Sequence, residues 1–274
     1  NENIESMKKY ASFLYFGNGI KCNKAESARY YKQLSDKGDI DSTVTYALML
    51  YYGDGVDVNK EEAAKKFKIA VEKNNIDAIV NYALMLHKGD GIEMNKEEAI
   101  KYLTIAIDKG NIYAMHNYAV ILFSGDGITA DKETAAKYFK KAADNGYIDS
   151  IKMYASMLYK GDGIEMNKNV SAKYYKLGAD KGDIESQIQY ISMLKNGDGI
   201  EKNDEELIKY YKLSANKGNA DSMREFALHL IFNGRGRLAV PYIKEAAKLG
   251  DCESTVIYRI ILDLENGMEV NKEN

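Results

Sequence analysis

The sequence contains few of the residues on which disulfide frameworks, metal sites and irregular linkers depend. Its 274 residues include one proline, two cysteines and three histidines. Cys22 and Cys252 lie near opposite ends of the chain, so we expect no disulfide between them in an extended fold. This cysteine usage favours a reducing compartment, and we therefore expect a cytoplasmic location. The single proline is typical of a nearly all-helical chain.

Charge and hydropathy exclude two further classes of protein. The 38 basic and 41 acidic residues give a formal net charge of −3, whereas nucleic-acid-binding domains usually carry clustered basic residues. No run of about 18 apolar residues is present, so we expect no membrane insertion. The chain begins at Asn1 inside the sequence pattern. We therefore expect it to be part of a longer protein whose start could carry a targeting signal.

The main feature of the sequence is a repeat of 36 residues. A pair of glycines separated by one residue recurs with this period, at Gly17/Gly19, Gly53/Gly55, Gly89/Gly91, Gly125/Gly127, Gly161/Gly163 and Gly197/Gly199. A fixed period of this size is typical of proteins built from stacked structural repeats. It therefore outranks any single motif as evidence of the fold.

Each period predicts two helices. In residues 76–88, apolar positions recur at spacings of three and four, which indicates one apolar helix face, and residues 96–109 show the same spacing. Gly89 and Gly110 follow these segments, where a residue without Cβ can adopt the left-handed conformation that ends a helix. Asn74 replaces the closing glycine in one copy. We therefore predict two antiparallel helices per repeat.

The start of the second helix is predicted by Asn95 and Glu98, which have the spacing of a reciprocal cap. The recurring Gly-Asp-Gly lacks the strand and the lysine with Ser/Thr of a phosphate loop. It also offers too few oxygen ligands for calcium. We therefore interpret the loop as a connector, and the residues Lys60 to Glu62 after it as a solvated first helical turn.

Two places depart from the repeat. In the seventh repeat the loop after Gly234 is shorter, so the sequence predicts that the next helix begins almost at once, with Pro241 in its first turn. The helix before this loop should contain one extra residue. Near the end, the sequence predicts a helix from Asp251 to about Glu265, a loop at Gly267 and the next cap at Asn271.

Two residue pairs recur within this framework. A Tyr-Ala pair occurs in the middle of the first helix, and an aromatic pair occurs in the second helix. The pairs are Tyr46-Ala47, Tyr82-Ala83, Tyr118-Ala119 and Tyr154-Ala155, with Tyr30-Tyr31, Tyr138-Phe139, Tyr174-Tyr175 and Tyr210-Tyr211. The sequence resembles the Sel-1-like repeat family, a relative of the tetratricopeptide repeats, although that family more often has Leu-Gly in place of Tyr-Ala.

This resemblance implies an all-α fold, a right-handed α/α superhelix (solenoid) of about seven helix-turn-helix repeats plus a terminal helix. We predict one solenoid over residues 1–274. Its repeats would span roughly 2–38, 39–74, 75–110, 111–146, 147–182, 183–218 and 219–250, with a half repeat at 251–274. The resemblance also implies an adaptor or scaffold in multiprotein complexes.

No combination of nucleophile, acid–base pair or metal ligands recurs around the histidines, so we predict neither an enzyme nor a bound cofactor or metal. The predicted function is a non-catalytic protein–protein interaction scaffold. It would bind a peptide or partner protein in a concave groove lined by the first helix of each repeat. One alternative is a regulatory repeat region of a larger protein with a catalytic domain, such as a kinase or cell-wall enzyme, outside this chain. Another is self-association through the terminal half repeat.

The predicted groove uses positions that vary between repeats while the framework stays fixed. These positions stand two before, two after and five after the tyrosine of the Tyr-Ala pair, and they share one side of a helix. The candidate residues are Val44, Leu48, Tyr51, Val80, Leu84, His87, His116, Val120, Phe123, Lys152 and Tyr159. Accessible apolar residues often mark partner sites, and aromatics are favoured anchors. The alternative is that Leu48, Leu84 and Val120 pack between successive first helices.

Overall fold

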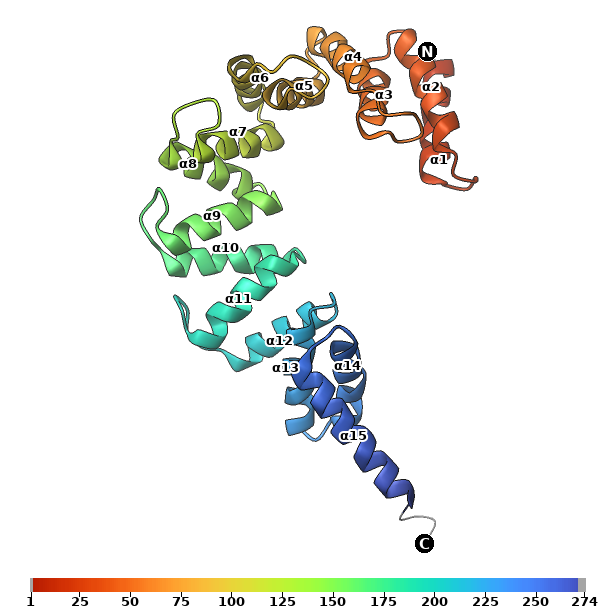
Figure 1. Cartoon of the computed structure of the whole chain (residues 1–274). Helices are drawn as coiled ribbons and strands as arrows, with labels where there is room; N and C mark the ends of the chain where they lie inside the picture. Colours follow the sequence, from red (N-terminus) through yellow and green to blue (C-terminus); the bar gives the residue numbers. More distant parts are fainter. Residues whose placement is uncertain (1, 271–274) are drawn as a thin grey trace. The chain divides into compact units, whose positions relative to one another are not determined.

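The computed structural model describes residues 2–270, which form fifteen α-helices and no strand (Figure 1). The helices are α1 (Glu2–Phe16), α2 (Lys24–Asp36), α3 (Ile40–Tyr52), α4 (Lys60–Glu72), α5 (Ile76–Lys88), α6 (Lys96–Asp108), α7 (Ile112–Ser124), α8 (Lys132–Asp144), α9 (Ile148–Lys160), α10 (Lys168–Asp180), α11 (Ile184–Asn196), α12 (Asp204–Ala215), α13 (Ala220–Phe232), α14 (Gly236–Lys248) and α15 (Cys252–Val270). Odd-numbered helices are the first helix of each repeat, here called helix A, and even-numbered helices are helix B.

The predicted helix ends are confirmed in the third repeat. Gly89 follows α5 with φ +71°, and its N–H donates to the carbonyl of Met85. Gly110 follows α6 with φ +80°, and Asn74 adopts the same left-handed region at φ 57°. The recurring glycines therefore end the helices for the reason that the sequence predicts.

The predicted reciprocal cap is also present, with one difference. Asn95 Oδ1 accepts from the backbone N–H of Glu98 at 3.0 Å, and Glu98 Oε2 accepts from the side-chain amide of Asn95 at 3.1 Å. The backbone N–H of Asn95 donates instead to the carbonyl of Leu86, at 2.9 Å. This third bond ties the end of the connecting loop back onto α5.

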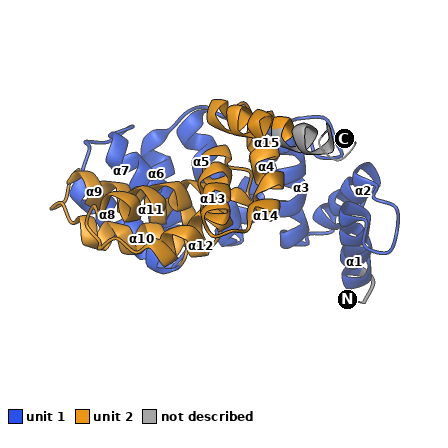
Figure 2. Ribbon diagram, turned by 90° about the horizontal axis from the view of Figure 1, so that it is seen from below, with its two compact units in different colours: residues 1–145 blue, residues 146–274 orange. Residues whose placement is uncertain are grey.

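The chain divides into two compact units, residues 1–145 and residues 146–274 (Figure 2). In each unit, every helix A that is followed by a helix B packs against it. In the first unit, Ala83 of α5 and Ala99 of α6 are fully buried, and the Tyr82 ring meets the Tyr102 ring edge-on at 5.5 Å. In the second unit, the aromatic pair Tyr190 and Tyr210 packs in the same way at 4.9 Å. The small residue allows the two helices to approach, and the tyrosines fill the space beside it.

The seventh repeat confirms one sequence prediction, the early start of its second helix, and differs from two others. Helix α13 has the same length as the helix A of the preceding repeats, and the extra residue Asn233 lies between it and the left-handed Gly234. Helix α14 begins directly at Gly236, so Pro241 lies in its second turn rather than its first. The predicted early start of this helix is confirmed, but the predicted place of Pro241 was wrong, because a first turn that starts at Gly236 ends before residue 241. The proline therefore removes a hydrogen bond from the interior of α14.

The last helix also extends further than predicted. Helix α15 continues through Gly267 to Val270, although the sequence indicated a loop there. Glu265 occupies the position that the left-handed glycine holds after the other A helices, so the residue that would end the helix is missing. The predicted cap at Asn271 lies outside the described residues.

Candidate partner-binding surface

One stripe of each helix A remains accessible to solvent. On α3, the accessible or half-buried residues along this stripe are Asp41, Thr45, Leu48 and Tyr52, at spacings of four, three and four. These spacings place them on a single side of the helix. We call this stripe the open face. Relative to the tyrosine of the Tyr-Ala pair, its positions are −5, −1, +2 and +6.

The open face of the first unit consists of the same four positions on four helices. Its residues are Glu5, Lys9, Ser12 and Phe16 on α1; Asp41, Thr45, Leu48 and Tyr52 on α3; Asp77, Asn81, Leu84 and Lys88 on α5; and Tyr113, Asn117, Val120 and Ser124 on α7. Of the three predicted rows (−2, +2 and +5), only the +2 row belongs to this face.

The +2 row combines packing with exposure. Leu48 and Leu84 are half-buried and pack against the cores formed with α4 and α6, whereas Val120 is 41% exposed. The alternative of packing between helices therefore holds for part of the Leu48 and Leu84 side chains. The remaining part of each side chain is available to a partner.

The −2 row lies closer to the following repeat. Val44 and Val80 are 7% and 1% exposed, so the prediction that they line a groove was wrong. The −2 position faces the start of the next helix A, and an apolar side chain there is covered. His116 is half-buried in the same row, with its ring 5.7 Å from that of Phe139 in α8.

Where the −2 residue is basic, it forms ion pairs with the start of the next helix A. Lys8 Nζ lies 2.8 Å from Asp39 Oδ1, and Asp39 caps α3. Burial alone would raise the pKa of Asp39, but hydrogen bonds from Lys8 and Ser42 lower it below its usual value. Lys152 is held in the same way by Glu185 at 3.0 Å and by the α11 cap at 3.9 Å. The predicted groove residue Lys152 is thus already paired within the chain.

The N-cap residue changes together with the −2 residue. The basic residues Lys8, Lys152 and Arg224 precede the caps Asp39, Asp183 and Asp251, with which they pair. The apolar Val44 and Val80 precede caps that are asparagine, Asn75 and Asn111. A neutral cap suits an apolar neighbour because a charge left unpaired there would be costly. Variation in this row is therefore explained by contacts within the chain.

The +5 row forms a contact that we call the inter-repeat clamp. Tyr51 donates its hydroxyl proton to Asp90 Oδ2 at 2.7 Å, and Lys60 Nζ lies 2.7 Å from Asp90 Oδ1. Lys60 Nζ also lies 5.0 Å from the centre of the Tyr51 ring, a cation–π distance. The tyrosine and the lysine belong to one repeat, and the aspartate belongs to the Gly-Asp-Gly loop of the next.

The clamp recurs elsewhere in both units. The other sets are Tyr15, Lys24 and Asp54; His87, Lys96 and Asp126; and Tyr159, Lys168 and Asp198. Phe123 occupies the same position in the fourth repeat, with its ring centre 4.9 Å from Lys132 Nζ. The predicted groove residues in the +5 row therefore direct the ends of their side chains to this contact. Only the sides of these side chains remain accessible to a partner.

The electrostatics of the clamp are internally balanced. Hydrogen bonds from Lys60 and Tyr51 hold the pKa of Asp90 below its usual value. Burial and the hydrogen bond to Asp90 raise the pKa of Tyr51 to about 12. At neutral pH the aspartate is therefore charged and the tyrosine is a neutral donor. One ammonium and one carboxylate offset each other, so the clamp leaves no net charge on the surface.

The second glycine of the loop makes the clamp possible. Gly91 has φ +68°, and a Cβ added to it would lie 2.3 Å from the carbonyl carbon of Lys60. The loop therefore lies directly against the first turn of the preceding helix B, which brings Asp90 to Lys60. The interpretation of the loop as a connector missed this role, and it also missed that Lys60, whose side chain remains 39% exposed, pairs with Asp90. The signal was present, because lysine and aspartate recur with the glycines.

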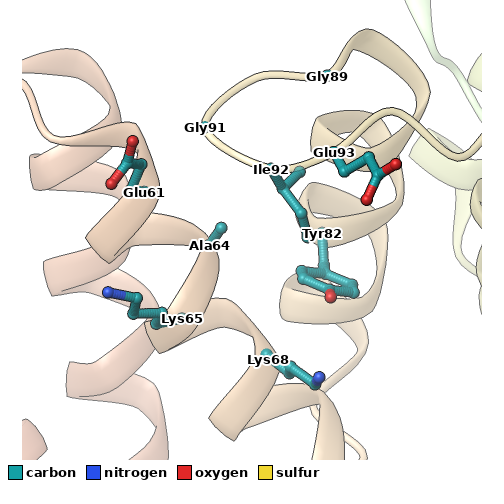
Figure 3. Close-up of a pocket in the computed structure, with 9 residues that line it drawn as sticks. All are labelled: Glu61, Ala64, Lys65, Lys68, Tyr82, Gly89, Gly91, Ile92 and Glu93. Carbon is teal, nitrogen blue, oxygen red and sulfur yellow. The ribbon is translucent and has the colours of Figure 1, made fainter.

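Two surface pockets accompany this framework. The first, of 540 Å³, lies between α4 and the loop that follows α5, with Glu61 and Lys65 on one wall and Gly91 to Glu93 on the other (Figure 3). It mixes both signs of charge. The second, of 320 Å³, lies between α1 and α3 and is lined by aromatic side chains. We call it the aromatic pocket.

The described residues show no sign of a metal centre or a membrane span. Among the described side chains, those of residues 4–263, no group of three or more His, Cys, Asp or Glu could hold a metal ion. None of the described helices combines the length and apolar character needed to cross a membrane.

Comparison with solved structures supports the same fold. A protective antigen of uropathogenic Escherichia coli strains, described as displaying an SLR fold, superposes with a TM-score of 0.75 at 22% identity, covering 95% of this chain and 56% of that chain. A Sel1 repeat protein from Oxalobacter formigenes gives 0.70 at 23%, covering 88% and 99%. An immunity protein from Pseudomonas aeruginosa gives 0.53 at 15%, covering 79% and 82%. The chain thus spans little more than half the length of the antigen's chain.

Comparison at the level of sequence identifies the family. A search of curated proteins finds no match. The Sel1 repeat, however, matches six segments, residues 4–39, 46–75, 76–111, 112–147, 148–183 and 192–219, which together make up most of the chain. The chain belongs to the Sel1 repeat family.

Proposed function

We propose that this chain is a non-catalytic scaffold that holds a peptide or protein partner against the open face of its A helices. Sel1 repeats generally serve in protein interactions and are typically non-catalytic. The proposal places the main contact in the first unit, on the +2 residues Leu48, Leu84 and Val120. Tyr51, His87 and Phe123 support this row from the side, because each is fixed beside it in the +5 position.

The observation that carries the proposal is the composition of the +2 row. The same position holds serine in Ser12 of α1 and Ser156 of α9, and helix A packs against its helix B in those repeats too. An apolar residue is therefore not required there for folding. Three successive repeats nevertheless carry Leu, Leu and Val at a position that keeps solvent access. Apolar side chains grouped on an accessible face commonly mark an interaction site.

The remaining positions of the open face suit an extended partner. The −1 row carries the uncharged polar residues Thr45, Asn81 and Asn117 beside the apolar row. Each donates one proton to a carbonyl of its own helix, but the hydroxyl and amide oxygens can still accept from a peptide backbone. An apolar row flanked by such groups is therefore suited to a peptide whose side chains contact Leu84 and its neighbours while its backbone is hydrogen-bonded.

Binding selection with matched variants tests the proposal. Peptides from a random displayed library would be selected on the wild-type chain, and their affinities measured by calorimetry. The double variant Leu84→Ser/Val120→Ser introduces the residue that other repeats carry in this row. Each lost apolar contact is worth about 1.5 kcal/mol, or roughly tenfold in affinity. The control is Leu228→Ser, the same change in α13 of the second unit.

We expect the double variant to weaken binding strongly while helical content and melting temperature stay close to wild type. The control should leave the affinity unchanged. Equal affinities for wild type and double variant would refute the assignment of the partner site to this row.

A further inference from the structure

The aromatic pocket lies on the open face and has a composition found at no other pair of repeats in the first unit. We infer that this pocket accepts one uncharged aromatic side chain, such as that of tryptophan or phenylalanine, from the peptide partner. The inference rests on the proposed function, because the pocket would anchor the same peptide that covers Leu48 and Leu84.

The geometry of the pocket indicates a single large side chain. Phe16 and Tyr52, both at the +6 position, are 67% and 70% exposed and line it from α1 and α3. Leu48 and the buried Met49 contribute apolar lining from α3, and Tyr31 contributes from α2. The volume of 320 Å³ is at the lower end of the range of ligand sites, about 300–1,000 Å³. It suits one aromatic side chain rather than an extended cofactor.

The charges around the pocket favour an uncharged occupant. Asp54 is the carboxylate of its wall, and this group is bound by the Tyr15 hydroxyl and lies 2.8 Å from Lys24 Nζ. Hydrogen bonds from Lys24 and Tyr15 hold the pKa of Asp54 below its usual value, so the pair stays charged and mutually compensated. Thr45 donates its hydroxyl to the carbonyl of Asp41 at 2.9 Å. The carboxylate and the threonine hydroxyl of the wall therefore already have partners, and a charged ligand would find no uncompensated counter-charge to replace its water.

Comparison with the next repeat shows how the residues of the pocket differ there. One period later, Lys88 stands in place of Tyr52, and the fully buried Phe67 stands in place of Tyr31. One aromatic side chain of the lining is thus replaced by a charged residue. Exposed aromatic side chains of this kind are the usual anchors of interfaces, because they offer a large contact area and lose little conformational freedom. The sequence therefore changes between these repeats in the residues that would hold an anchor.

The test uses N-acetyl-tryptophanamide as the probe and methyl NMR of the whole chain as the readout. The Met49 and Leu48 methyl groups should shift with saturation, because an indole ring in the pocket would lie beside them. N-acetyl-lysinamide and N-acetyl-aspartamide serve as charged comparisons and should cause no saturable shift. The chain contains no tryptophan, so the fluorescence of the probe also reports its own environment.

Variants taken from the chain's own repeats make the test specific. Tyr52→Lys introduces the residue found at Lys88 and should abolish the saturable response, with little effect on stability at so exposed a position. Phe232→Lys changes an aromatic residue that is 85% exposed on α13 and should leave the response intact. Absence of a saturable response in the wild type, or its persistence in Tyr52→Lys, would overturn the inference.

Library-selected peptides separate this inference from the proposed function. If Tyr52→Lys and Leu84→Ser/Val120→Ser both weaken peptide binding at least tenfold, the inference is supported. If only the Leu84/Val120 variant weakens binding, the pocket is not the anchor site, although the scaffold function stands. If neither variant weakens binding, both proposals are wrong.

Discussion

The clamp predicts that two glycines with the same backbone conformation differ in their tolerance of alanine. Gly91 and Gly110 both have positive φ, +68° and +80°. A Cβ at Gly110 would meet no atom within 4 Å, whereas a Cβ at Gly91 would lie 2.3 Å from the carbonyl carbon and 2.5 Å from the carbonyl oxygen of Lys60. Gly110→Ala therefore tests backbone conformation alone, and Gly91→Ala tests conformation together with contact between repeats.

The expected magnitudes follow from these distances. A left-handed conformation costs a residue with a Cβ roughly 1–2 kcal/mol, and Gly110→Ala should lower the free energy of unfolding by that amount. At Gly91 the obstacle is backbone, so shortening the Lys60 side chain cannot relieve it and the loop must move away. Overpacking of this kind costs about 1–3 kcal/mol more. We therefore expect Gly91→Ala to be the more damaging change by that difference.

Urea unfolding followed by circular dichroism measures the loss of unfolding free energy in each variant. Amide hydrogen exchange shows which helices are destabilised. Because repeat proteins are stabilised by contacts between neighbours, the added loss in Gly91→Ala should appear as faster exchange in α4 and α5. Gly110→Ala should have no such effect on α4. Equal losses in both variants, with unchanged exchange in α4, would refute the view that the loop is wedged against Lys60.

Three further predictions concern single contacts. The folded-state pKa of Tyr51, about 12, exceeds its usual value near 10, so the clamp stabilises the fold fully below about pH 10 and this contribution is lost as the pH rises toward 12. In Tyr51→Phe, the free energy of unfolding measured in urea should therefore fall less steeply over this pH range than in the wild type. The same steepness in both proteins would contradict this. Pro241→Ala should raise the melting temperature, because it restores a helical hydrogen bond within α14 worth up to about 3 kcal/mol, including the relief of the ring clash. Lys8→Val should destabilise the chain by leaving Asp39 without its ammonium partner, and adding Asp39→Asn should recover most of the loss; a double-mutant cycle with a coupling energy near zero would contradict this pairing.

Much of the fold could be predicted from the sequence because its signals are local. The left-handed glycines and the asparagine caps act within one turn of the helix that they bound, so α5 and α6 were predicted to within a residue. The failures in this category, at Asn233, Pro241 and Gly267, arise where the local signal itself changes. At the first two the loop is altered in length, and at the third Glu265 replaces the glycine that would end the helix.

The candidate surface was harder to predict because it depends on contacts between repeats. The three predicted rows share one side of helix A, but which side faces solvent depends on how closely the next repeat packs. The next repeat covers Val44 and Val80 and engages Tyr51 through Asp90, which leaves Leu48 and its neighbours accessible. Periodicity shows that Lys60 and Asp90 both recur. It does not show that the loop brings them together.

The division of the clamp between repeats has a consequence for how such a chain can change its length. The third repeat shows this division, because it supplies His87 and Lys96 to the clamp with the following repeat and Asp90 to the clamp with the preceding one. Duplication or removal of a whole 36-residue block that carries these residues would therefore recreate a complete clamp at the new boundary. The open-face residues of the block would be duplicated or removed together with it. At the sixth and seventh repeats, Asp204 and Arg235 stand where other repeats have lysine and aspartate, and a Cβ added to Gly236 would meet no atom within 4 Å, so this loop is not wedged against the preceding helix B. A block cut at that boundary would bring Asp204 to the loop aspartate of another repeat, a group of like charge, and would not recreate the clamp.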